Sequence, residues 1–176
     1  MDLRRQRIEN EWTILGQMAA ANPSSLLRKK RCGDQFLLAL HETRAPILED
    51  GKVKLVSDHE LRISFARFFP AMPLEIYLTR PVFHPNVHPA TGFVCLWSRF
   101  SQTNTVVEAL CRLQRILTYS VFSGSLDDVM QPEALAWATN TERGTVFPLT
   151  CVALTKPSKW EEGTIRRNSP PRRRLF

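Results

Sequence analysis

The spacing of apolar residues changes along the chain from a helical to an extended pattern. Between residues 2 and 21, Ile8, Trp12 and Leu15 recur at i, i+4 and i+7, which predicts an amphipathic helix. We expect Asn22-Pro23 to end this helix, because proline disfavours helical backbone at the residue before it.

Four short segments that follow are apolar or alternate between apolar and polar residues, and they predict strands. These segments are 36–42, 52–57, 61–69 and 74–79. The short linkers between them favour an antiparallel meander, and Glu49-Asp50-Gly51 is a turn signal. Phe69-Pro70-Ala71-Met72-Pro73 predicts a rigid corner between the third and fourth strands.

Helical patterns return in the second half of the chain. Thr105-Val106-Val107-Glu108 has the spacing of a capping box, in which the threonine and glutamate side chains bind free backbone N–H groups. Apolar residues then recur every three or four positions up to Leu117, so we expect one helix face to pack on the sheet. Residues 132–138 predict a shorter helix with Pro132 in its first turn. Residues 145–155 are weakly β-like and predict no definite element.

This order of elements predicts an α+β fold in a single domain over residues 1–155. Residues 156–176 are polar and basic, and we expect them to form a disordered tail. The chain has no run of about 18 apolar residues, so no membrane span is expected. Its charged N-terminus lacks an apolar secretory core, which indicates a cytoplasmic protein.

The segment from Pro81 to Phe100 fits none of these patterns. Its three prolines and one glycine exclude a regular helix or a central strand, yet it is rich in large apolar residues. A long irregular segment that packs against a core is usually functional. Because it also contains Cys95, we interpret it as an active-site loop around a thiol. The alternative is that Cys95 is only a buried apolar residue of the loop.

The four cysteines, at positions 32, 95, 111 and 151, include no C-x-x-C pair. This spacing argues against a zinc ribbon and a disulfide scaffold and fits free thiols in a reducing compartment. Cys111 lies in a helical pattern and has the context of a small apolar residue. His84, His88 and Cys95 would leave a metal without a fourth ligand, so we expect neither a metal site nor a cofactor.

The net charge of +7 is distributed unevenly. Residues 1–31 carry +4, residues 32–155 carry −2 and residues 156–176 carry +5. A nucleic-acid-binding domain usually carries its basic patch on the folded core, so nucleic-acid binding through the basic ends is the minor alternative. Arg4, Arg5 and Arg7 form either a solvated helix face or a face that docks a partner.

Several motifs occur in an order that resembles the ubiquitin-conjugating enzyme family over roughly residues 1–140. His84-Pro85-Asn86 is similar to the family's HPN tripeptide, and Gly92-Phe93-Val94-Cys95-Leu96 is similar to its G-x-[IV]-C-L nucleophile segment. Phe69-Pro70-Ala71-Met72-Pro73 resembles the family's aromatic-Pro-x-x-Pro corner. Residues 127–134 resemble the acidic loop and helix start that follow the long helix. The resemblance implies the UBC-like fold, with an N-terminal helix, a four-stranded antiparallel meander, the active-site loop and then helices on one sheet face.

The chain also departs from the family pattern. The interval from Asn86 to Cys95 is longer than is common, and Trp97 stands where an acidic residue is frequent. The corner lacks its last proline, and no helix pair is evident after Asn140. These departures resemble divergent bacterial members of the family, from ubiquitin-like conjugation systems in antiphage defence.

The resemblance implies an activity and its partners. Cys95 would accept the C-terminal carboxylate of a ubiquitin-like protein as a thioester from an activating enzyme, and then transfer it to the amine of a protein substrate. The basic tail would bind the activating enzyme, a ligase-like partner or nucleic acid. The alternative is a non-catalytic scaffold of the same fold that binds a ubiquitin-like protein or another partner.

The resemblance implies two further catalytic residues, Asn86 and Asp128, and His84 and Asp127 are expected to support them. Asn86 would donate to the oxyanion or hold the Cys95 loop in place; otherwise it only forms a turn. His84 is a structural hydrogen-bonding residue or a base. Asp128, or Asp127 beside it, would orient and deprotonate the incoming amine, unless both are solvated loop acids.

Overall fold

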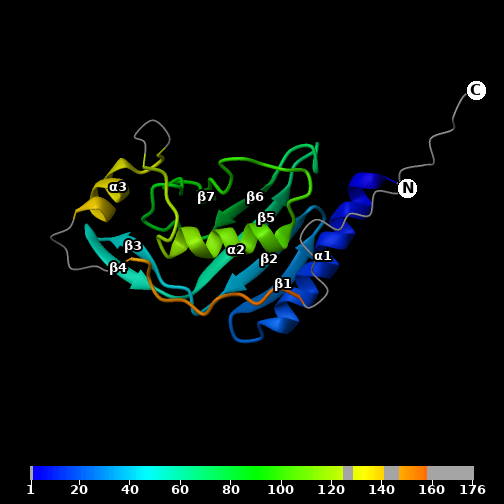
Figure 1. The fold of residues 1–176 in the computed structure, drawn as a ribbon, viewed down its shortest axis with the longest axis horizontal. Helices are drawn as coiled ribbons and strands as arrows, with labels where there is room; N and C mark the ends of the chain where they lie inside the picture. The colour runs from blue at the N-terminus through cyan, green and yellow to red at the C-terminus, as the bar shows by residue number, and fades with distance from the viewer. Residues whose placement is uncertain (1, 125–128, 141–146, 158–176) are drawn as a thin grey trace, which may run out of the picture.

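Figure 1 shows the computed structural model, which describes residues 2–124, 129–140 and 147–157. The elements are α1 (Leu3–Ala21), β1 (Leu26–Cys32), β2 (Gln35–Leu40), β3 (Ala45–Glu49), β4 (Lys52–Val56), β5 (His59–Phe65), β6 (Leu74–Leu78), β7 (Phe93–Val94), α2 (Val106–Leu117) and α3 (Pro132–Thr139). The predicted α+β class, with an N-terminal helix before an antiparallel sheet and helices after it, is confirmed.

The main sheet has five antiparallel strands in the order β1-β2-β5-β6-β7. Three of the four predicted strands, β2, β5 and β6, belong to this sheet, and the fourth does not. The segment predicted at 52–57 is β4, which pairs with β3 in a separate hairpin. Asp50 and Gly51 at the tip both have positive φ, as a tight type I′ turn requires.

Two main-sheet strands lie outside the predicted set because their sequences lack an apolar alternation. β1 is an edge strand that consists largely of exposed basic residues, and β7 has only two residues. The other hairpin strand, β3, contains Pro46, which is tolerated because this strand has a partner on one side only.

Both long helices contribute to the main core. The predicted capping box is present, with Thr105 and Glu108 binding the first backbone groups of α2. Figure 1 shows α2 lying across the sheet and α1 beside β1. α3, with Pro132 in its first turn as predicted, packs through Trp137 in a second cluster with Tyr119, Phe83 and Val53 of β4.

Two of the three N-terminal arginines bind within the domain. The Arg4 guanidinium donates to the carbonyl oxygens of Phe65 and Ala66 and forms an ion pair with Asp34. Arg7 pairs with Glu11 of the same helix at 2.7 Å and donates to Asn104 O, outside the helix, at 3.2 Å. The structure therefore assigns Arg4 and Arg7 to neither of the two expected roles, because both join α1 to the rest of the domain.

Glu11 is a buried acid that links the two long helices. Its side chain is 0% exposed and accepts hydrogen bonds from Arg7 Nε at 2.7 Å and from the Val106 N–H, at the start of α2, at 2.8 Å. Burial raises the pKa of Glu11, and the Val106 N–H and Arg7 oppose that shift. The N-terminus of α2 therefore depends on a carboxylate from α1.

The segment after residue 148 crosses from the hairpin towards α1 (orange in Figure 1) without forming a helix or a named strand. Two side-chain amides bind it, one from α2 and one from the residue directly after α1. Gln114 donates to Val152 O at 2.8 Å and accepts from Leu154 N at 3.1 Å, while Asn22 exchanges the same two kinds of bond with Thr155. These amides serve as the hydrogen-bonding neighbour that a strand would otherwise supply.

Two expectations about the limits of the domain remain predictions. The boundary at residue 155 is one, and most of the expected basic tail, from residue 158 onwards, lies outside the described residues. Of the helices that the structure describes, none has the length and apolar character needed to cross a membrane.

We predict that Glu11→Ala will lower the free energy of unfolding by about 2–4 kcal/mol, because it leaves Arg7 and the Val106 N–H without their buried partner. Glu9→Ala is the matched control, since Glu9 lies on the same helix and pairs with Arg31 at the surface. Urea unfolding should show a much smaller loss for Glu9→Ala. Equal losses would contradict the role of Glu11.

Candidate functional site

Cys95 directly follows β7, where the chain alternates between buried and partly exposed side chains. Val94 and Leu96 are buried on either side of it, and Cys95 itself is partly exposed. Its backbone N–H donates to Asn86 O at 2.8 Å. Cys95 is therefore a partly exposed residue between two neighbours that are fixed in the core.

The turn before Cys95 depends on Gly92. Gly92 has φ +70°, and a Cβ atom there would lie 2.0 Å from Leu78 O, so no other residue fits. The Leu78 N–H donates to Gly92 O at 2.9 Å. This close backbone approach attaches the loop to β6 just ahead of the thiol.

The Asn86 side chain is 8% exposed and joins two segments that are far apart in the sequence. Its Nδ2 donates to Ser123 Oγ at 3.0 Å and to Cys95 O at 3.4 Å. Its Oδ1 accepts from the Ser123 N–H at 2.9 Å. Both amide hydrogens have acceptors in this arrangement, which fits the role of holding the Cys95 loop better than that of a free oxyanion donor.

His84 belongs to this loop and is 0% exposed. Its Nδ1 accepts the Asn86 N–H at 3.0 Å, and its ring lies 4.2 Å from that of Tyr119. Its buried Nε2 has no partner among the described residues. Burial lowers the pKa of His84 to about 3, so the imidazole is neutral at ordinary pH and fits the structural role expected for it rather than that of a base.

Residues that follow α2 bind the carbonyl oxygens of the loop. Gln131 Nε2 donates to Val82 O at 2.9 Å and to Val87 O at 2.7 Å. Tyr119 Oη donates to Phe83 O at 2.6 Å. Neither Tyr119 nor Gln131 was a predicted site residue. A polar glutamine directly before the helix proline was the only sequence signal, and it is a weak one.

The predicted acids Asp127 and Asp128 lie outside the described residues. The described residues on either side of them contact the loop. Ser123 binds Asn86, and the Met130 N–H donates to Pro85 O at 2.8 Å. The role expected for the two acids remains a prediction.

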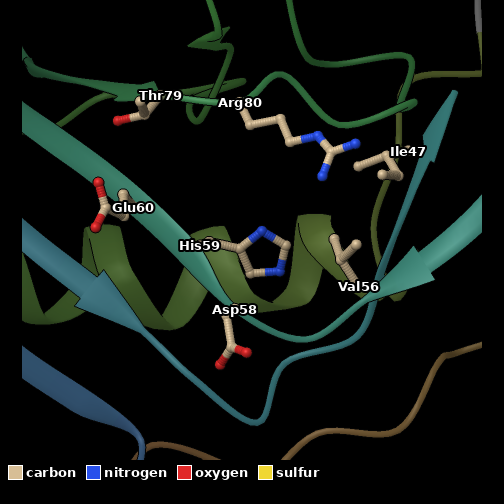
Figure 2. A pocket seen from close by; sticks show the side chains of 7 residues that line it. All are labelled: Ile47, Val56, Asp58, His59, Glu60, Thr79 and Arg80. Atoms are coloured by element: carbon tan, nitrogen blue, oxygen red, sulfur yellow. The ribbon is translucent and has the colours of Figure 1, made fainter. Parts of the chain in front are cut away.

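A pocket between the hairpin and the main sheet shares no residue with the Cys95 loop (Figure 2). Its charged side chains bind neighbouring groups. Asp58 pairs with His41, Arg80 with Glu49, and Glu60 with Lys29. His59 Nε2 lies 2.8 Å from Thr43 O, and burial lowers the pKa of His59. Each charged side chain of the pocket thus already has a partner of opposite charge or, for His59, a backbone acceptor.

No cluster of three or more histidine, cysteine, aspartate or glutamate side chains suited to a metal ion occurs within the described ranges. Cys111, which has the context of an apolar residue in the sequence, is half-buried and packs against the main core. Burial raises the pKa of its thiol. Cys95 is the cysteine that lies in the loop itself.

Comparison with known proteins places the fold but not the activity. No model of a protein family matches the chain, and no curated protein does. A solved structure described as a ubiquitin-conjugating enzyme from Trypanosoma cruzi is similar with a TM-score of 0.57 and 17% identity, over 78% of this chain and 91% of that one. One described in the same way from Plasmodium yoelii gives 0.56 and 18%, over 81% and 87%. The chain therefore has the UBC-like fold.

We predict that the stability of the protein will fall below neutral pH because His84 binds a proton far more weakly when folded. Its pKa is about 3 in the fold against 6.5 in a free side chain, so this contribution is complete above pH 6.5 and is lost as the pH falls towards 3. Between pH 7.5 and 4.5 it amounts to about 2–3 kcal/mol.

His84→Asn is the matched variant, because its amide oxygen can accept the Asn86 N–H but cannot titrate. Urea unfolding at both pH values should show that the wild type loses more stability on acidification than the variant. Equal losses would mean that His84 is not the group responsible, since other groups, such as His59, titrate in both proteins.

Proposed function

We propose that the protein is a ubiquitin-conjugating-enzyme-like carrier that accepts a ubiquitin-like protein on Cys95 and transfers it to a target amine. The single observation that carries the proposal is the partly exposed Cys95, held between buried residues in the loop of a UBC-like fold.

The proposed reaction has two acyl-transfer steps. The Cys95 thiolate attacks the thioester carbonyl of the modifier on the activating enzyme, so that a new C–S bond forms and the activating-enzyme thiolate leaves. A neutral target amine then attacks the Cys95 thioester. A C–N bond forms, the amine loses a proton, and Cys95 leaves as a thiolate that can take up a proton.

In this proposal Asn86 steadies the loop, and its amide can reach an oxyanion only if a bond to Ser123 or Cys95 O is exchanged. Asp128, or Asp127, would orient and deprotonate the amine. His84 supports Asn86 through the backbone. The partners are an activating-enzyme-like protein, a ubiquitin-like protein and a protein substrate.

Sequence resemblance to divergent bacterial proteins further suggests a place in antiphage defence. The non-catalytic scaffold is the competing function, and it would use the same fold to bind a ubiquitin-like protein without forming a covalent bond. The partly exposed Cys95 favours the carrier. An adjacent reading frame for an activating-enzyme-like protein would support the conjugation system.

We predict that incubation with a cognate activating enzyme, a ubiquitin-like protein and ATP will give an adduct heavier by one modifier. Thiol reagents should release the modifier from this adduct. Cys95→Ala should abolish the adduct, because the variant has no sulfur at this position to form the thioester. Cys111→Ala is the matched control and should form the adduct normally, since Cys111 packs in α2.

A persistent adduct in Cys95→Ala would contradict the nucleophile assignment.

Thiol labelling separates the carrier from the scaffold. In a variant with serine at positions 32, 111 and 151, the folded protein should react with one equivalent of a thiol probe at Cys95. Absence of labelling there would favour the scaffold.

We also predict that Asn86→Ala will lower the free energy of unfolding by about 1–3 kcal/mol, because it leaves the Ser123 N–H and Cys95 O without their partner. Ser123→Ala removes only the hydroxyl acceptor and should cost less. A transfer rate reduced by Asn86→Ala with unchanged stability would instead support the oxyanion role.

A further inference from the structure

A groove runs beside the segment that follows Cys95, and its lining is strongly basic. Trp97 and Arg99 come from that segment, Arg112 and Arg115 come from α2, and Lys156 also lines the groove. Glu108 is the acidic residue of this lining. Four cationic side chains therefore face a single carboxylate in one small groove.

The single carboxylate does not neutralise the arginines. Glu108 accepts from the Thr105 N–H at 2.8 Å and from its hydroxyl, so it serves the capping box of α2. Arg112 donates through Nε to Leu96 O and so fixes the wall of the groove. Arg99 and Arg115 form no ion pair with any described residue, so their charges are available to a ligand.

The wall also contains a donor in need of an acceptor. The Trp97 Nε1–H is shielded from solvent and has no hydrogen-bond partner within the described part of the chain. A buried indole N–H normally finds an acceptor. A carboxylate in the groove would supply a counter-charge for the arginines, and it would accept from this N–H once the indole turns towards the groove.

The positive charge of the groove indicates which kind of ligand it can bind. Residues 156–176 carry a net charge of +5, so the chain's own C-terminal segment is a poor charge match for a basic groove. Nucleic acid generally requires a longer track of cations along its phosphates, whereas the arginines here line one small groove. A carboxylate on a flexible side chain can reach the Trp97 N–H more readily than a phosphate held in a sugar backbone.

We propose that this groove binds an acidic segment of a protein partner, with carboxylates paired to Arg99 and Arg115 and one accepting the Trp97 N–H. Binding needs no thioester, because Cys95 does not line the groove. The inference goes beyond the carrier function and stands whether or not Cys95 forms a thioester.

The test measures binding of a fluorescent hexaglutamate peptide to the full chain carrying Cys95→Ser, by anisotropy at low and at physiological salt. We expect binding that weakens with salt, and no binding of a hexaglutamine peptide. The double variant Arg99→Glu/Arg115→Glu should weaken it by about ten-fold or more, since each ion pair contributes a factor of a few.

Arg5→Glu combined with Arg67→Glu is the matched control, because it makes the same change of net charge at exposed positions outside the groove. It should change the affinity by about two-fold or less. Trp97→Phe should weaken binding several-fold without unfolding the protein. An unchanged affinity in that variant would overturn the assignment of the indole.

Equal weakening by the control pair would overturn the proposal, because it would show attraction to net charge alone. Absence of hexaglutamate binding would also overturn it. So would tighter binding of a single-stranded DNA oligonucleotide that is lost in the Arg99→Glu/Arg115→Glu variant, because the groove would then be a nucleic-acid site. If the wild type forms no thioester but still binds hexaglutamate, only the carrier proposal is contradicted.

Discussion

Buried backbone groups must find hydrogen-bond partners, and the position of Cys95 depends on how the loop before it meets this requirement. Prolines keep most of that loop out of the sheet, so its carbonyl oxygens cannot all pair with a strand. They are bound instead by Gln131 and Tyr119, while Asn86 reaches from the loop to Ser123. The nucleophile candidate is therefore positioned by residues that come later in the chain.

The same solution recurs at the C-terminal segment. A side-chain amide carries one acceptor and one donor group, as a peptide unit does, and can therefore replace a strand neighbour. Gln114 and Asn22 do this for residues 152–155, and the Glu11 carboxylate does a related task at the start of α2. Each of these buried polar groups joins two elements. Substituting one should loosen a connection between elements rather than a single element.

Local patterns were sufficient for the parts of the fold that bury one regular face. The spacing of Ile8, Trp12 and Leu15, and the capping box at Thr105, predicted both long helices closely. The pattern failed for β1, whose exposed basic residues have no alternation, and for the pairing of β4 with β3. The pairing of strands depends on which segments meet in space. The sequence of a single strand indicates only that its backbone is extended.

The sequence by itself determined the α+β class, the loop around Cys95 and the pairing of that cysteine with Asn86 as candidate site residues, because these features are encoded in short contiguous motifs. Tertiary structure alone decided that Asn86 binds Ser123, that His84 is buried with a pKa of about 3, and that Arg99 and Arg115 line one groove. Those facts arise from contacts between distant segments. Burial and hydrogen-bond geometry exist only once the chain has folded, so local motifs do not record them.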